Sequence, residues 1–278
     1  MPDQVVRRHR PEQDKRSILL AVILVSMTLF RFVELPTLNW GALQVFGSPL
    51  GFTLGGGALL TLLVVGLVAT GTLSILQDHP LRESKERPLV FSLITPSMAA
   101  LLVSLFLIQA ATWALWIATL IVGGALIGFL VFMAYRALSP RSPAYPGART
   151  LLNVVDYLAG FVLFSMILVQ QGRALVTAPA VVVLSGLLAI DLLSATGVRT
   201  GQVLLYGGTI ALLEGELAWV LGYWPISTWT AATLMTLGLY TWSGIGYQHL
   251  LGRLTSRIIT EFVVIGLLMF VIVLWMRP

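Results

Sequence analysis

The chain has 278 residues, of which 57% are hydrophobic and only 10% are charged, and its mean hydropathy is +0.91. Soluble globular proteins carry about 25% charged residues, so this composition excludes that class. The formal net charge of +5 does not indicate a nucleic-acid partner, because the basic residues gather in one set of loops. The absence of cysteine excludes disulfides, thiolate metal sites and cysteine nucleophiles.

Nine apolar segments, separated by short polar loops, fill almost the whole chain. A membrane-spanning helix needs roughly 20 apolar residues, and each segment is close to that length. We therefore expect an all-α, polytopic membrane bundle of about nine transmembrane helices, without a soluble domain. Residues 1–16 form a basic cytoplasmic tail, and residues 17–276 form a single transmembrane domain. The predicted spans are 17–33, 50–76, 89–109, 112–135, 151–170, 176–194, 202–223, 226–247 and 258–275.

The basic residues give the orientation of these spans. Cytoplasmic loops of membrane proteins carry an excess of Lys and Arg. With the N-terminus in the cytoplasm, fourteen basic residues lie inside, and only Arg31, Arg173 and Arg277 lie outside. This asymmetry places the C-terminus outside and predicts a prokaryotic-type cytoplasmic membrane. The inner set is Arg7, Arg8, Arg10, Lys15, Arg16, Arg82, Lys85, Arg87, Arg136, Arg141, Arg149, Arg199, Arg253 and Arg257.

The segment 35–49 is the longest predicted outer loop, and it contains no Lys or Arg. It is apolar enough to lie along the membrane surface, which we favour, or to dip back into the membrane as a re-entrant segment. Aromatic residues at the predicted outer ends indicate an interfacial belt. They are Trp40, Trp113, Trp116, Tyr223, Trp224, Trp229 and Trp275.

Small residues and one proline predict how the spans pack and bend. Gly124 and Gly128 have GxxxG spacing, which favours close contact between membrane helices. Pro96 lies inside the third predicted span, where its ring would remove a backbone hydrogen bond. We therefore expect a kink at Pro96.

Intrinsic cofactors and metals are not expected. Haem and most transition-metal sites need buried imidazoles, whereas His9, His79 and His249 lie in the tail, in a loop and at a helix end. Both lysines, Lys15 and Lys85, lie outside the spans, which excludes a retinal Schiff base. The expected partners are the lipid bilayer and either other membrane subunits or further copies of the chain, with no nucleic acid.

Charges inside a membrane are costly, so each needs a reason. In the outer half, Arg31 and Glu34 are three residues apart and can form an ion pair that anchors the first span. Glu214 and Glu216 are two residues apart and point about 200° away from each other on a regular helix. Either Glu216 reaches outward while Glu214 contacts a polar neighbour, or the helix is unwound at Gly215. These four charged residues are our candidates for a substrate or ion pathway.

The inner half contains a second group of candidates: Asn153, Asp156, Asp191 and Glu261. Asp156 and Asp191 lie at similar depth on consecutive helices, and two carboxyl groups sharing a site can act as acid and base. We favour the simpler interpretation that the two are separated. In that case the inner carboxylates pair with Arg149, Arg199 or Arg257.

No catalytic motif is evident, and the favoured function is a transporter or permease-like protein for a small or amphipathic solute. The alternative is a non-catalytic structural or assembly subunit of a larger membrane complex. A third possibility is an intramembrane enzyme acting on lipid or peptide. A carrier requires a polar cavity reaching Glu214, a subunit requires few internal polar groups, and an enzyme requires Asp156 and Asp191 in contact.

Overall fold

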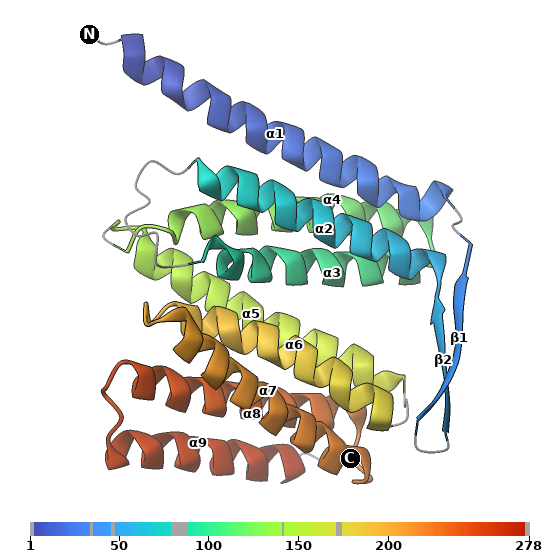
Figure 1. Ribbon diagram of the computed structural model, residues 1–278, viewed down its shortest axis with the longest axis vertical. Helices are drawn as coiled ribbons and strands as arrows, with labels where there is room; N and C mark the ends of the chain where they lie inside the picture. The colour runs from blue at the N-terminus through green and yellow to red at the C-terminus, as the bar shows by residue number, and fades with distance from the viewer. Residues whose placement is uncertain are drawn as a thin grey trace. The chain divides into compact units, whose positions relative to one another are not determined.

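The structure is a computed structural model that describes residues 3–33, 36–45, 48–78, 88–140, 142–170 and 174–275. Within these ranges, the backbone alone is described for residues 3–16, 38–54, 174–175 and 272–274. The described chain is built from long α-helices (Figure 1). They are α1 (Asp3–Phe32), α2 (Gly56–Gln77), α3 (Ile94–Gln109), α4 (Trp113–Arg136), α5 (Tyr145–Val169), α6 (Ala174–Ser194), α7 (Thr200–Gly222), α8 (Thr228–Leu250) and α9 (Ser256–Trp275).

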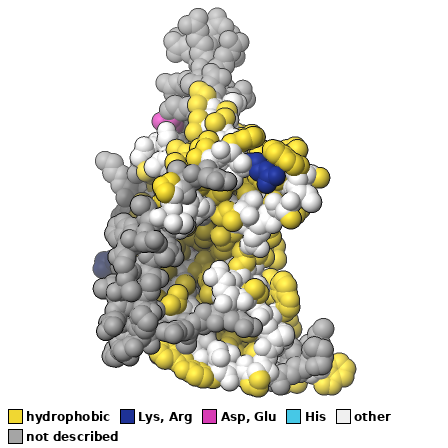
Figure 2. Space-filling model, turned by 90° about the vertical axis from the view of Figure 1, so that its right-hand side faces the viewer, with side chains coloured by type: hydrophobic (Ala, Val, Ile, Leu, Met, Phe, Trp, Pro, Cys, Tyr) yellow, Lys and Arg dark blue, Asp and Glu magenta, His cyan; other side chains and the backbone are white. Residues whose placement is uncertain are grey.

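Each predicted span corresponds to one of these helices, which confirms the all-α membrane bundle. In the described residues, six helices are long and apolar enough to cross a membrane: α2, α3 with the 3-10 turn before it, α4, α5, α6 and α7. The apolar part of α1, Ser17–Phe32, is shorter. The count of nine spans stays a prediction. Figure 2 shows hydrophobic side chains over much of the described surface on one face, with few charged groups among them.

A β-hairpin between α1 and α2 departs from the prediction. Strands β1 (Leu38–Val45) and β2 (Ser48–Leu54) pair antiparallel, with an irregular register between Asn39 and Ala42. The segment 35–49 is therefore not a plain loop, and the second span begins at Gly56 rather than near residue 50. Two local effects explain this shift. Aromatic and β-branched residues favour strand in 38–54, and the three glycines at 55–57 oppose an earlier helix start.

Pro96 does not kink the middle of a helix. A 3-10 helix, η1 (Leu89–Leu93), leads directly into α3, and Pro96 lies in the first turn of α3. Proline is tolerated there because the N–H groups of a first turn have no partner within the helix. The third span therefore changes from 3-10 to α geometry just before Pro96.

The contacts divide the chain into two compact units, of which the first comprises Met1–Pro80 and Pro96–Tyr135. In this unit, α4 lies against α1 through its glycines. A Cβ built at Gly124 would come within 2.5 Å of Leu24, and one at Gly128 within 2.6 Å of Leu20. The GxxxG pair therefore forms a helix contact, as predicted.

The second unit comprises Leu81–Thr95 and Arg136–Pro278. Here α6 and α7 pack closely, α5 contacts both α6 and α8, and α9 packs on α8. Gly207 of α7 lies against Ile190 of α6, and Gly215 lies against Val182. These small residues bring the backbones of α6 and α7 together, and they place Asp191 and Glu214 in the interior of this unit.

Candidate functional site

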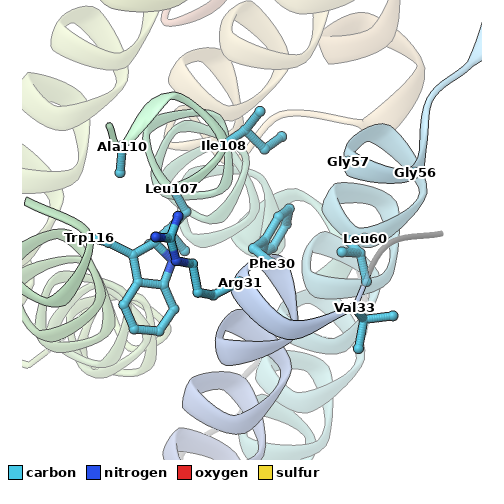
Figure 3. A pocket seen from close by; sticks show the side chains of 10 residues that line it. All are labelled: Phe30, Arg31, Val33, Gly56, Gly57, Leu60, Leu107, Ile108, Ala110 and Trp116. Carbon is cyan, nitrogen blue, oxygen red and sulfur yellow. The ribbon is translucent and has the colours of Figure 1, made fainter. Parts of the chain in front are cut away.

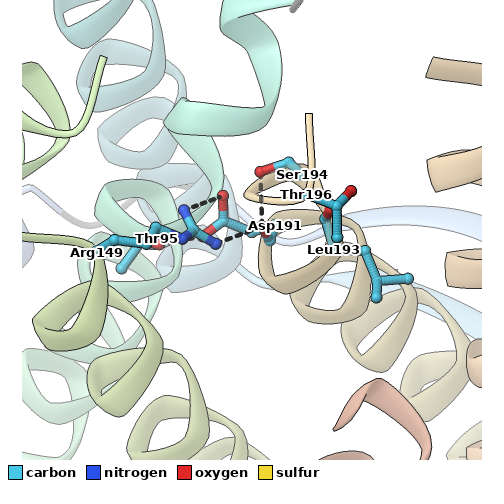
Figure 4. Close-up of polar contacts among 6 residues, drawn as sticks. All are labelled: Thr95, Arg149, Asp191, Leu193, Ser194 and Thr196. Carbon is cyan, nitrogen blue, oxygen red and sulfur yellow. Dashed lines mark hydrogen bonds and ion pairs between the residues drawn. The ribbon is translucent and has the colours of Figure 1, made fainter. Parts of the chain in front are cut away.

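The most polar buried site of the second unit joins Arg149 of α5 to Asp191 of α6 (Figure 4). The Arg149 Nη1 lies 3.5 Å from the Asp191 Oδ1, and Nη2 donates a hydrogen bond to the Asp191 main-chain oxygen. Thr95, at the start of α3, donates its hydroxyl proton to Asp191 Oδ2 at 2.8 Å. The side chains of Arg149 and Asp191 are only 12% and 1% exposed, so the pair is shielded from solvent and lipid.

Asp156 is the second carboxyl group of this site. It lies seven residues after Arg149, which is two helical turns, so α5 carries both side chains on one face. Asp156 is completely buried, and its carboxyl group interacts electrostatically with Asp191 and Arg149. Within the described part of the chain, neither Asp156 oxygen has a hydrogen-bond donor.

The expectation that Asp156 and Asp191 are separated is therefore wrong. It assumed one arginine for each carboxylate, whereas Arg149 serves both, because the heptad spacing on α5 turns Asp156 toward α6. The expected pairing of Asp191 with Arg149 is confirmed. We name the group Asp156, Asp191, Arg149 and Thr95 the carboxyl pair site.

Charge counting defines what this site can do. Two ionised carboxylates beside one guanidinium leave an uncompensated negative charge in a buried place, which is unfavourable. If one carboxyl group holds a proton, that proton can form a hydrogen bond to the other, and Arg149 balances the remaining charge. The carboxyl pair site is thus suited to hold and release one proton.

The remaining inner candidates do not join this site. Glu261 forms an exposed ion pair with Arg257 one turn earlier on α9, with 3.0 Å between Nε and Oε1. Asn153 lies one turn before Asp156 on the same helix, and its side-chain oxygen has no hydrogen-bond donor among the described residues. Glu261 is therefore a helix-surface residue, as the simpler interpretation expected.

Glu214 and Glu216 lie in quite different surroundings. The helix α7 is continuous through Gly215, so the unwound stretch is not present. Glu216 is exposed, whereas Glu214 is completely buried and lies against Gly238 of α8. Neither carboxyl oxygen of Glu214 has a hydrogen-bond partner in the residues that are described. The expected polar neighbour of Glu214 is therefore not found there.

The outer candidates of the first span are only partly described. The guanidinium of Arg31 lies over the ring of Trp113, 4.4 Å from its centroid, which is a cation–π contact. Glu34 and Arg173 lie outside the described residues, so the Arg31–Glu34 ion pair stays a prediction. Trp113 is exposed, as an interfacial residue should be, whereas Trp116 is buried at 5% exposure.

The sequence analysis did not identify Thr95 as a member of the carboxyl pair site, and it identified the role of Arg149 only in part. Thr95 gave no signal, because a threonine beside a proline is usually a helix-start residue. Arg149 was considered only as a partner for single carboxylates. The seven-residue spacing between Arg149 and Asp156 was the signal that could have placed both on one helix face.

The comparisons with known proteins identify a family without assigning an activity. Residues 36–276 match the model of a family described as "Protein of unknown function (DUF5656)". No curated protein and no solved structure matches the chain.

Proposed function

Because the chain belongs to the DUF5656 family, whose description gives no activity, we propose a function from its buried charges. We propose a transporter or permease-like protein for a small or amphipathic solute, coupled to the movement of protons. The carboxyl pair site is the proton-binding site. The observation that carries the proposal is the burial of two adjoining carboxyl groups with a single arginine inside apolar helices.

The first argument for proton coupling is the free-energy cost of burying ionisable groups. Ionisable groups within membrane segments are expensive, and in pumps and transporters chains of Asp, Glu and His relay protons. A subunit with a purely structural role gains nothing from a second carboxyl group at Arg149, because Asp191 alone would balance that charge. We therefore infer that Asp156 functions by binding and releasing a proton.

Access to substrate is the second argument, and it favours transport over catalysis. Asp156 and Asp191 are 0% and 1% exposed, so a lipid or peptide bond cannot reach either carboxyl group in this conformation. A proton can reach them through a modest rearrangement of α5 against α6. We assign Asp156 as the group that gains and loses the proton, and Arg149 and Asp191 as the groups that hold it in place.

Glu214 is a second candidate in the same unit. A buried carboxyl group without a polar partner is most stable when it is protonated, and Gly238 leaves room for it against α8. In the proposed mechanism, Glu214 binds a second proton.

Proteoliposomes containing the purified full chain and a pH-sensitive dye in the lumen test this proposal. A panel of small cations and of neutral and anionic amphiphiles is added in turn under an imposed membrane potential. We expect at least one solute to change the luminal pH with the wild-type chain. Asp156→Asn should abolish the change, and Asp78→Asn, at an exposed carboxyl group after α2, should retain it. If no solute produces a protein-dependent change, the transport proposal fails and the structural-subunit alternative takes its place.

A further inference from the structure

The first unit contains a cavity of about 290 Å³ at the ends of four helices (Figure 3). It lies where α1 and α3 end and where α2 and α4 begin, which the charge pattern predicts to be the outer side. Most of its lining residues are apolar in type, polar atoms make up the larger part of its surface, and Arg31 is its one charged residue among those described. The lining residues are Phe30, Arg31, Val33, Gly56, Gly57, Leu60, Leu107, Ile108, Ala110 and Trp116.

Three kinds of hydrogen-bond donor meet at this cavity. The first is the guanidinium of Arg31, which lines the cavity (Figure 3). The second is the indole N–H of Trp116, which is buried and has no acceptor among the described residues. An unpaired buried N–H is costly, so this group calls for an acceptor.

The third donor is the N-terminus of α2. The N-cap residue is Gly55, which offers no side-chain cap, and the first turn contains no acidic residue. The N–H groups of Gly56 and Gly57 therefore point out of the helix without intrahelical partners, and the helix dipole favours a negative charge there. Both glycines line the cavity. A helix N-terminus, a guanidinium and an unpaired indole N–H together define a site for an anionic oxygen group.

The apolar side chains in the lining define the rest of the ligand. Pockets for small molecules usually measure about 300–1,000 Å³, so this cavity holds a headgroup and the first carbons of a chain. Ile108 lines the cavity and is also 47% exposed on the outer surface of α3. A hydrocarbon chain can therefore pass from the cavity along Ile108 into the surrounding lipid.

We infer that this cavity binds an anionic amphiphile, namely a phosphate or carboxylate attached to an alkyl chain. Arg31 and the α2 N-terminus bind the charge, the Trp116 N–H donates to one oxygen, and the apolar lining side chains Leu60, Leu107 and Ile108 contact the chain. The inference is independent of the proposed transport, since it concerns binding in the first unit alone.

Native mass spectrometry of the full chain in a neutral detergent tests the inference. The probes are phosphatidylglycerol and phosphatidylcholine as bilayer lipids, and dodecyl phosphate and dodecyltrimethylammonium as single-chain amphiphiles. Inorganic phosphate is the probe without a chain. We expect one tightly bound molecule of phosphatidylglycerol or of dodecyl phosphate, and weak binding of both the zwitterionic and the cationic probe. Preference for phosphatidylglycerol indicates a bilayer lipid, and preference for dodecyl phosphate indicates a single-chain solute.

The variants make the test specific to the cavity. Arg31→Gln should weaken binding of the anionic amphiphile about 10-fold, as expected for the loss of one charged hydrogen bond. Trp116→Phe, which keeps the ring and removes only the N–H, should weaken it several-fold. Arg253→Gln, at an exposed arginine after α8, is the matched control and should leave affinity unchanged. The inference is overturned if both Arg31→Gln and Trp116→Phe bind as tightly as wild type. It is equally overturned if inorganic phosphate alone binds as well as dodecyl phosphate.

Discussion

Arg149 holds Asp191 at two points, the side-chain carboxylate and the main-chain oxygen. The main-chain oxygen belongs to the last turn of α6, where carbonyl groups have no partner within the helix. Ser194 also donates to it, at 2.6 Å (Figure 4). Arg149 thus neutralises a buried carboxylate and also caps the C-terminus of α6, with Thr95 bonding the same carboxylate from α3. This one arginine ties the start of α5 to the end of α6.

Replacement of Arg149 by methionine should be the most destabilising single change at this site. It leaves two buried carboxyl groups without a cation and removes the Arg149 hydrogen bond to the Asp191 main-chain oxygen, and breaking a buried ion pair costs about 3–5 kcal/mol. Arg149→Lys retains the charge but cannot make both contacts. Its stability should therefore lie between those of the wild type and of Arg149→Met. Unfolding in SDS followed by tryptophan fluorescence measures the difference. A methionine variant as stable as wild type would show that the contact contributes little.

Asp156→Asn should partly rescue Arg149→Met. The asparagine removes one of the two ionisable carboxyl groups, and its amide can donate a hydrogen bond to the Asp191 carboxylate, with which Asp156 interacts. In the wild-type background the same change should leave stability unchanged or slightly higher. A double-mutant cycle in SDS measures the coupling, which should be at least about 1 kcal/mol for groups in one network. Strict additivity of the two changes would mean that Asp156 and Arg149 do not interact.

The helical part of the fold was predictable because membrane helices follow from apolar length alone. Each predicted span has a corresponding helix, since a backbone in lipid has few other ways to satisfy its hydrogen bonds. The hairpin Leu38–Val45 and Ser48–Leu54 escaped this reasoning. Its second strand overlaps the start of the second predicted span, because hydropathy does not separate strand from helix in such a short segment.

The carboxyl pair site was predictable in its members but not in its geometry. Asp156, Asp191 and Arg149 all stood out as charges in or near apolar segments. Their assembly depends on the rotation of α5 against α6, which is set by side-chain packing between the two helices. Glu214 illustrates the same limit. The sequence suggested a polar neighbour, whereas Glu214 is completely buried and lies against Gly238 of α8.

Cysteine labelling should confirm the orientation of the helices, and the chain has no native cysteine to interfere. Single cysteines at Ser142 and Thr255 should react with an impermeant thiol reagent only from the cytoplasmic side. Cysteines at Thr37 and Ser227 should react only from outside. The expectation rests on the fourteen-to-three distribution of basic residues. Labelling of Ser142 and Ser227 positions from the same side would contradict the predicted order of spans.

Two adjacent glycines on α7 offer a matched test of the contact between α6 and α7. A Cβ at Gly207 would lie 2.6 Å from Ile190 Cγ1 and within 3.6 Å of the Ile190 backbone, whereas one at Gly208 would have no atom within 4 Å. Gly207→Leu must therefore push the helices apart, and overpacking of this kind costs about 1–3 kcal/mol.

Gly208→Leu should instead increase the stability of the protein. It extends into open space and replaces glycine by a residue with a helix propensity better by about 0.8–1 kcal/mol. Both variants carry the same side chain on the same helix, so their difference in SDS unfolding reports the contact rather than the residue type. Because Asp191 follows Ile190 directly, Gly207→Leu should also weaken the proposed proton-coupled flux, and Gly208→Leu should not. Equal stability of the two variants would place the α6–α7 contact elsewhere on α7.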